Sequence, residues 1–516
     1  MKQRTKGIIV AAFFAVILVT STVTLALNSG PMQNPEAKLT ITGTPEDHFP
    51  DLRREQFCQS SEAKSNAYVT EYKIPTKCTM PLAVTVDEAG NVWFAQTTTG
   101  MVAKFDPLSK KFTEYENPEW TEMTRTMVWG MDYSNGNVWF TDDAHNAIWR
   151  FSTQDGTYHP IGFPPSTESL PQHLKIRNNH VVVNDFYGGK ISFLDLNQNR
   201  TYLNVPSPIA GSFTGGFDFD SKGSVWYTNW MLRQGGALVK FDYAQFSGLS
   251  TIPDNSTSLQ YSDVFNLPPD LGTPVGLAID KSDNVWIADT SSSSFFKFDP
   301  VLQKFTKYMT SDAIPETYGN RTGVIKTPVT GPYWIQTDGD KIVFNEQIGN
   351  AIAVFDTITE SLIEYHVPSK NPNWADCGGN KDCGIAQVFG FKAAGDKVWF
   401  TEWVENNIGV VDLTKPLPVE LSVSQTTLKI PRGQSAQVEV NLSTTSSADV
   451  SSKTSSVFGD VTVDLVPQSV VAGATKIIPV LITADESALP DTYKILISAR
   501  TTDVTVSQYI TVIVTQ

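Results

Sequence analysis

The chain has 516 residues, more than one ordinary domain holds, so at least two folding units are expected. Hydrophobic residues make up 41% of the sequence, and 34 Gly with 30 Pro suit a turn-rich β protein with few helices. The net charge of −15 argues against a nucleic-acid partner, because an acidic body repels phosphate backbones.

The N-terminal segment, residues 1–30, contains an uncharged apolar stretch over 8–27 that follows three basic residues. This stretch is long enough for a membrane-spanning helix with its N-terminus inside. A cleaved signal peptide is the alternative, although Thr24-Leu25-Ala26 is a mediocre cleavage site. Either interpretation places the body of the protein outside the cytoplasm, membrane-anchored or secreted, after a linker over 31–66.

Four cysteines, Cys58, Cys78, Cys377 and Cys383, lie in loop-like sequence. In an oxidising exterior two disulfides are expected, most simply 58–78 and 377–383, although four cysteines allow three connectivities. The cysteines do not form CxxC pairs and have no histidine at ligand spacing, which argues against a metal site.

A repeat dominates residues 67–415. A buried second strand recurs at intervals of 43 to 60 residues, as NVWFAQ (91–96), NVWFTD (137–142), VVVND (181–185), SVWYTN (224–229), NVWIAD (284–289), KIVFNE (341–346) and KVWFTE (397–402). An apolar strand and a polar turn precede each copy, and further strands follow it. Four short strands in each of seven repeats predict an all-β fold whose body is a seven-bladed β-propeller.

Ring closure and a second domain also follow from the pattern. Residues 69–75 match a fourth strand but precede the first blade, whereas the seventh copy lacks a fourth strand. We therefore expect the N-terminal strand to complete blade seven and remove an open sheet edge. Over 416–516 the repeat stops, and short alternating runs predict an immunoglobulin-like β-sandwich.

The NVWFTE-like second strands, the Asn407-Ile408-Gly409 third strand and the EY-containing fourth strands resemble the virginiamycin B lyase family, the streptogramin lyases. The resemblance spans all seven blades, roughly 67–415. It implies the propeller fold and, in that family, elimination at an ester with Mg²⁺ and histidines. Those histidines stand at the start of the first strand in the last two blades.

The matching positions of this chain carry Tyr333 and Phe389, with Gln387 where the family motif has an acid. None of the three can replace a histidine base or a carboxylate ligand. The histidine in a comparable segment is His173, in blade three and one residue past the aligned position. An isolated histidine of this kind is more often structural than catalytic.

Acids and amides end the seven second strands and are expected to surround one entrance of the channel: Gln96, Asp142, Asp185, Asn229, Asp289, Glu346 and Glu402. Asp and Asn at such positions commonly cap backbone N–H groups of the adjoining turn. Glu is a poor local cap, so Glu346 and Glu402 are the candidate metal ligands. They could hold a Mg²⁺ or Ca²⁺ ion or attract a cationic ligand.

The insertions 309–330 and 369–386 connect a fourth strand to the next first strand, which places them at this same entrance. Long loops on a rigid scaffold often carry binding residues. The predicted ligand-binding residues there are aromatic: Tyr333, Phe389, Trp374, Trp403 and Trp129.

Three functions are compatible with these features. The favoured one is a non-catalytic, surface-displayed propeller that binds a small-molecule, glycan or protein ligand at this entrance. The second is a metal-dependent lyase or lactonase-like enzyme of the same fold with altered residues. The third is a structural envelope protein. The missing histidines at 333 and 389 favour the first function over the second.

Overall fold

The computed structural model describes residues 57–120, 127–143, 145–163, 169–197, 202–231, 235–246, 254–323 and 325–516. The predicted anchor or signal segment over 1–30 lies outside these ranges. Within them, no helix has the length and apolar character needed to span a membrane. The described chain is all-β apart from the short helices α3 (Tyr243–Phe246), α4 (Asn255–Leu259), α5 (Pro315–Tyr318) and η2 (Pro372–Trp374).

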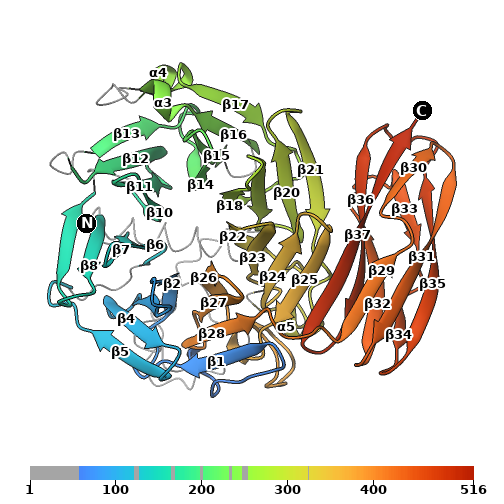
Figure 1. The fold of residues 1–516 in the computed structure, drawn as a ribbon, viewed down its shortest axis with the longest axis horizontal. Coiled ribbons are helices and arrows are strands. Elements are labelled where there is room, and N and C mark those ends of the chain that lie inside the picture. The colour runs from blue at the N-terminus through green and yellow to red at the C-terminus, as the bar shows by residue number, and fades with distance from the viewer. Residues whose placement is uncertain are drawn as a thin grey trace, which may run out of the picture.

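Seven blades of four strands each stand around a central axis and form a β-propeller (Figure 1). Blade one consists of β2 (Pro81–Val86), β3 (Val92–Gln96), β4 (Met101–Asp106) and β5 (Lys111–Tyr115); blade two of β6 (Met131–Ser134), β7 (Asn137–Asp142), β8 (Ala147–Ser152) and β9 (Tyr158–Gly162); blade three of β10 (Pro171–Arg177), β11 (His180–Asp185), β12 (Lys190–Asp195) and β13 (Tyr202–Pro206). Blade four consists of β14 (Phe213–Phe219), β15 (Val225–Met231), β16 (Gly235–Phe241) and β17 (Ser262–Asn266); blade five of β18 (Pro274–Ile279), β19 (Val285–Asp289), β20 (Ser294–Asp299) and β21 (Lys304–Met309); blade six of β22 (Pro332–Asp338), β23 (Lys341–Glu346), β24 (Ala351–Asp356) and β25 (Ser361–His366).

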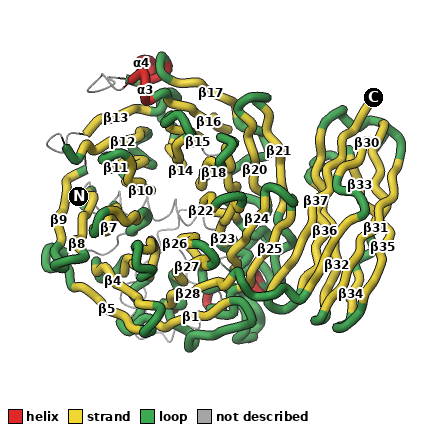
Figure 2. Tube along the Cα trace, viewed as in Figure 1, coloured by secondary structure: helices red, strands yellow, loops and turns green. Residues whose placement is uncertain are grey.

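Blade seven closes the ring with the N-terminal strand. It consists of β26 (Val388–Ala394), β27 (Lys397–Glu402), β28 (Asn407–Asp412) and β1 (Val69–Lys73). Strand β1 pairs antiparallel with β28, with Val69 opposite Val411 and Lys73 opposite Asn407. The predicted closure is therefore confirmed, and Figure 2 shows the two strands side by side at the edge of the ring.

A hydrogen bond explains why a polar turn and a second-strand tryptophan recur together in the sequence. In three blades the second-strand tryptophan donates its indole N–H to the aspartate of the preceding turn at 2.8 to 3.0 Å: Trp93 to Asp87, Trp226 to Asp220, and Trp286 to Asp280. The same aspartates accept hydrogen bonds from turn backbone N–H groups. Each tryptophan thus belongs to the core between blades and fixes its own hairpin.

The C-terminal residues form two facing sheets. One has the order β29-β31-β35-β33 and the other β37-β36-β32-β34, with β30 parallel to β37. The strands are β29 (Val419–Val423), β30 (Thr427–Pro431), β31 (Ser435–Thr444), β32 (Ala448–Thr454), β33 (Val461–Asp464), β34 (Gln468–Val470), β35 (Thr475–Ala484), β36 (Thr492–Arg500) and β37 (Val504–Thr515). Buried residues such as Val440, Ile482 and Val512 fill the space between the sheets. That the sandwich is immunoglobulin-like stays a prediction.

The sandwich joins blade six through a shared sheet that the sequence did not predict. Strand β37 pairs antiparallel with β25, with Ser361 opposite Gln508 and Tyr365 opposite Val504. Lys494 of β36 adds an ion pair, its Nζ lying 2.5 Å from Oε1 of Glu360. The sandwich is consequently a direct continuation of one blade (Figure 1).

Candidate functional site

The central channel has two ends, which we name by the connections that surround them. The loop end carries the connections from fourth to first strands, including 309–330 and 369–386. The hairpin end carries the turns between first and second strands. The innermost strand of each blade runs from the loop end to the hairpin end, so a residue's place along that strand decides which end it faces.

The loop end is filled by an aromatic plug, which consists of Trp129, Tyr333, Phe389, Trp374 and Trp403. The ring centroids of Phe389 lie 5.7 Å from those of Trp129, Tyr333 and Trp403. Trp374 lies 6.0 Å from Trp403, and none of the five side chains is more than 5% exposed. The structure thus gathers all five predicted ligand-binding residues, but as packed interior that presents no open surface.

The two long loops cover this plug. The backbone N–H of Asn320 donates to the carbonyl of Asp376 at 2.9 Å, which joins one loop to the other. Disulfides link Cys377 to Cys383 in the second loop and Cys58 to Cys78 before β2. This is the simplest pairing predicted from the sequence, and two disulfides indicate an oxidising, extracellular compartment.

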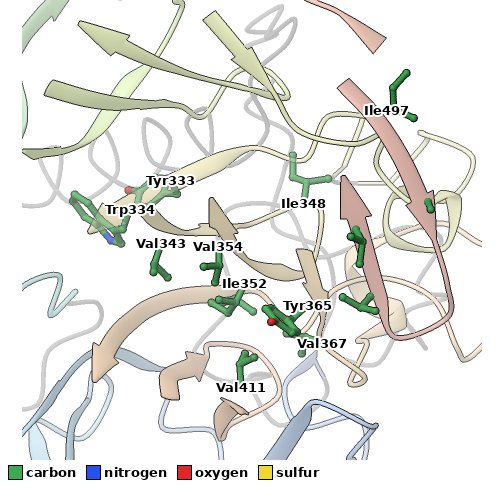
Figure 3. Packing of buried hydrophobic residues seen from close by; sticks show 14 of the residues in the cluster. Tyr333, Trp334, Val343, Ile348, Ile352, Val354, Tyr365, Val367, Val411 and Ile497 are labelled. Carbon is green, nitrogen blue, oxygen red and sulfur yellow. The ribbon is translucent and has the colours of Figure 1, made fainter. Parts of the chain in front are cut away.

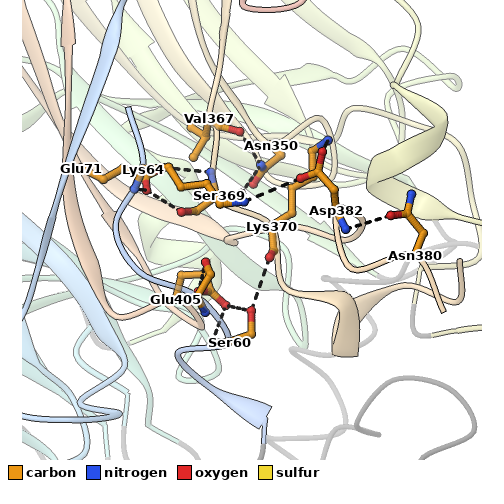
Figure 4. A network of polar contacts seen from close by, with 11 residues as sticks. Ser60, Lys64, Glu71, Asn350, Val367, Ser369, Lys370, Asn380, Asp382 and Glu405 are labelled. Atoms are coloured by element: carbon orange, nitrogen blue, oxygen red, sulfur yellow. Dashed lines mark hydrogen bonds and ion pairs between the residues drawn. The ribbon is translucent and has the colours of Figure 1, made fainter. Parts of the chain in front are cut away.

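Glu402 is buried beside a second carboxyl group. Its Oε2 accepts a hydrogen bond from Asn407 at 2.6 Å, and its neighbour is Glu71 of β1. Figure 4 shows that Glu71 in turn accepts from the backbone N–H groups of Ser369 and Lys64, at 3.0 and 2.7 Å. Burial, and then the charge of Glu71, raise the pKa of Glu402 well above its usual range. Burial also raises the pKa of Glu71, so this pair of carboxyl groups holds a proton more strongly than two exposed glutamates would.

Glu346 repeats this arrangement in blade six. It lies buried against Glu364 of β25, which accepts a hydrogen bond from the backbone N–H of Ser311 at 2.9 Å. Burial and the charge of Glu364 raise the pKa of Glu346 in the same way. Each glutamate predicted as a metal ligand thus lies beside a second buried carboxyl group of its own blade, and the pKa of both members of each pair is raised.

Glu346 and Glu402 end the second strands of adjacent blades, and each has a carboxyl neighbour of its own. Among the described residues, no group of three or more His, Cys, Asp and Glu side chains is placed to hold a metal ion. The binding of Mg²⁺ or Ca²⁺ by Glu346 and Glu402 stays a prediction. The aspartates of the same ring act as caps: Asp185 accepts from the N–H of Leu170 at 2.6 Å, and Asp289 from that of Thr273 at 2.8 Å.

The hairpin end contains a cavity of about 340 Å³. Trp334 and His173 form its floor, stacked with ring centroids 5.3 Å apart and planes 29° apart. Figure 3 shows Trp334 next to Tyr333 on β22, so adjacent residues of one strand contribute to the floor and to the plug. At the position equivalent to Trp334, four blades have glycine: Gly130, Gly216, Gly276 and Gly390.

These glycines are required by close approach of neighbouring first strands. A Cβ atom on Gly390 would lie 1.9 Å from the carbonyl oxygen of Leu82, and one on Gly276 would lie 2.2 Å from that of Tyr333. Without side chains at four of the seven positions, the two rings of the floor have open space beside them.

Polar side chains line the wall of the cavity. They lie two residues after the floor position on each first strand, nearer the hairpin end. They occupy one equivalent position of the first strand in five blades: Asp132, Lys175, Asp218, Gln336 and Lys392. Residues two apart on a strand point to the same side, which is why this set faces the cavity together with the floor.

Most of the wall side chains fasten neighbouring blades together. Asp132 accepts from the N–H of Ile176 at 2.9 Å, and Gln336 donates to the carbonyl of Phe391 at 2.9 Å. The Nζ of Lys175 lies 2.6 Å from Oδ1 of Asp218. Lys392 is different: it is half-buried, and its ammonium group makes no hydrogen bond or ion pair with any residue that the structure describes.

His173 is neutral at physiological pH. Burial, followed by the charges of Lys175 and Lys392, lowers the pKa of His173 to about 3. Sequence reasoning placed His173 near the channel as a structural residue but missed the wall. The available signal was the presence of charges, such as Lys175 and Lys392, inside otherwise apolar first strands.

No protein-family model matches the chain, and no curated protein matches its sequence. Among solved structures, virginiamycin B lyase from Staphylococcus aureus has a TM-score of 0.50 and 22% identity, over 68% of this chain and 100% of that one. A streptogramin B lyase has a TM-score of 0.51 and 20% identity, over 67% and 99%. A catalytically inactive form of the Staphylococcus aureus lyase with quinupristin gives a TM-score of 0.50 at 22% identity. At such identities the likeness extends to the fold alone: this chain is similar to the streptogramin lyases in its β-propeller.

Proposed function

We propose that this chain is an extracytoplasmic β-propeller, held at the membrane by residues 1–30, that binds a small ligand in the cavity at the hairpin end. The observation that carries the proposal is the contrast within one channel. The loop end is packed, whereas the hairpin end has about 340 Å³ of space beside two flat rings and a lysine without a partner among the described residues. Cavities of this size with a few convergent polar groups are typical of ligand sites.

The proposal moves the site from the loop end, where the sequence suggested it, to the hairpin end. The sandwich continues blade six through a shared sheet, so we assign it the role of a spacer or adhesion module rather than a lid. We also propose that the protein does not open streptogramin rings. The family's histidine positions hold Tyr333 and Phe389, both fully buried, and burial raises the pKa of the Tyr333 hydroxyl above its ordinary value of 10.0.

A metal-dependent lyase or lactonase remains the second candidate because His173, a neutral imidazole, lies on the cavity floor. The low pKa of His173 makes it a weak base, so we expect no ring opening above background when the purified ectodomain is incubated with a streptogramin B and Mg²⁺. Mass spectrometry would detect the linear product. Ring opening that disappears in a His173→Ala variant would establish the second candidate instead.

Binding itself is tested by ligand-observed NMR with a panel of anionic, neutral and cationic single-ring and fused-ring compounds. We expect at least one class to bind the full ectodomain and to lose its signal in a Trp334→Leu variant. A Lys397→Gln variant, changed at an exposed residue of the same β-hairpin as Lys392, is the matched control and should bind as the parent does. Binding that is unaffected by Trp334→Leu would place the site elsewhere.

A further inference from the structure

We propose that the ligand of the hairpin-end cavity is a small planar organic acid, whose ring stacks on Trp334 and whose carboxylate is bound by Lys392. This inference rests on the proposed function and adds the chemical class of the ligand. It draws on three properties of the cavity: its flat floor, its charge and its size.

The floor favours a flat ring. Trp334 and His173 come from blades six and three and lie face to face across the channel with planes 29° apart. Phe217 meets His173 edge-on at 5.4 Å and so holds the imidazole in place. Aromatic faces that are already fixed by their neighbours can stack on a planar ligand without losing further rotational freedom.

The charges of the cavity wall favour a ligand with one negative charge. Lys175 and Asp218 compensate each other through their ion pair at 2.6 Å, and Arg177 lies over the ring of Phe219 at 4.5 Å near the rim. The carboxylate of Asp132 is already bound to the N–H of Ile176. Lys392 is the cation of the wall that the described residues leave unpaired, and a half-buried ammonium group gains most from an ionised acceptor.

The positive charge of the cavity lining contrasts with the negative charge of the whole protein. The chain has a net charge of −15, yet its central cavity carries Lys175, Arg177 and Lys392 against Asp132 and Asp218. A cationic ligand would be repelled by Lys392, and the lining has three cationic side chains against two carboxylates, an excess of one positive charge. A monoanion therefore matches the wall best.

The size of the cavity limits the ligand. A volume of about 340 Å³ is at the lower end of the range for small-molecule sites, which begins near 300 Å³. The cavity therefore suits one ring or a fused pair of rings with its acid group, and it excludes a long glycan or a peptide from the floor.

The test compares acids with their uncharged isosteres on the full ectodomain. The probes are benzoate, indole-3-carboxylate and 2-naphthoate, each beside its carboxamide, with tryptamine as a cationic ring; affinities are measured by isothermal titration calorimetry or ligand-observed NMR. At least one acid should bind about tenfold tighter than its carboxamide, as expected for a charge-assisted contact. The Lys392→Gln variant should bind that acid no better than the amide, and the Lys397→Gln control should keep the difference.

The possible outcomes separate the two proposals. If carboxamides or tryptamine bind as tightly as the acids, and Trp334→Leu abolishes this binding, the cavity is a ligand site but the acid class is wrong. If no probe of any class binds, both the acid class and the ligand site are contradicted. Thermal melting of each variant confirms that it is folded, which is expected for Lys392→Gln because Lys392 is half-buried and makes no contact that holds the blades together.

Discussion

The two ends of the channel are built from the same seven first strands, yet they differ in what fills them. At the loop end, large side chains from blades two, six and seven meet across the axis, and Trp129 contacts Tyr333 and Phe389. At the hairpin end, four glycines at one position leave two rings beside an open cavity. The position of a residue along its first strand therefore determines which end of the channel it faces. The side chains of the other blades determine whether that residue is packed or faces open space.

The first prediction removes the strand that completes blade seven and closes the ring. A chain that starts at residue 81 lacks β1, so β28 becomes an open edge and Glu402 loses Glu71. We expect loss of the cooperative unfolding transition in circular dichroism, because apolar surface and strand hydrogen bonds are exposed together. A chain that starts at residue 57 is the control. Equal melting temperatures for the two chains would contradict the closure seen between β1 and β28.

The second prediction separates the two ends by their contributions to stability. Phe389→Ala should lower the free energy of unfolding by about 3–5 kcal/mol, because it opens a cavity in the aromatic plug. Lys392→Gln, at the hairpin end of the same strand, should change it by less than about 0.5 kcal/mol. Urea unfolding measures both variants. If both variants lost equally little free energy of unfolding, the loop end would not be the packed end of the channel.

The third prediction concerns the buried acid pairs. Because the native pKa of Glu402 is raised, the folded protein holds this proton at pH values where the unfolded chain has lost it. The contribution of Glu402 to stability is therefore fully present below the unfolded pKa and is lost as the pH rises through the native one. Glu402→Gln keeps a donor toward Glu71 and does not titrate.

The Glu402→Gln variant should thus be more stable than the parent at pH 8, and the difference should shrink toward pH 4. Melting temperatures across this pH range measure the effect, with Glu420→Gln on the exposed face of β29 as the control. If Mg²⁺ or Ca²⁺ stabilised the parent and Glu402→Gln abolished that stabilisation, the glutamate would instead be a metal ligand.

Much of the fold could be predicted because the repeat is local. Each Trp–Asp turn lies within one hairpin, and the unmatched strand over 69–75 leaves one blade to complete. The pairing of β25 with β37 could not be predicted, because it joins segments more than a hundred residues apart and leaves no local pattern.

The candidate site was predicted less well for the same physical reason. Register correctly brought Tyr333, Phe389 and Trp129 to one end, but nothing in any single strand reveals that their rings fill the channel. Nor could the sequence show that Lys175 is paired with Asp218 while Lys392 makes no such contact among the described residues. Both facts depend on side chains from different blades.

Fluorine NMR of the ectodomain labelled with 5-fluorotryptophan tests the difference between the two ends most directly. The resonances of Trp334 and Trp403 are assigned with Trp334→Phe and Trp403→Phe variants, and indole-3-carboxylate is then titrated. The Trp334 resonance should shift in a saturable manner while that of Trp403 in the plug stays in place. A shift of Trp403 with no change at Trp334 would return the binding site to the loop end and contradict the assignment of the cavity.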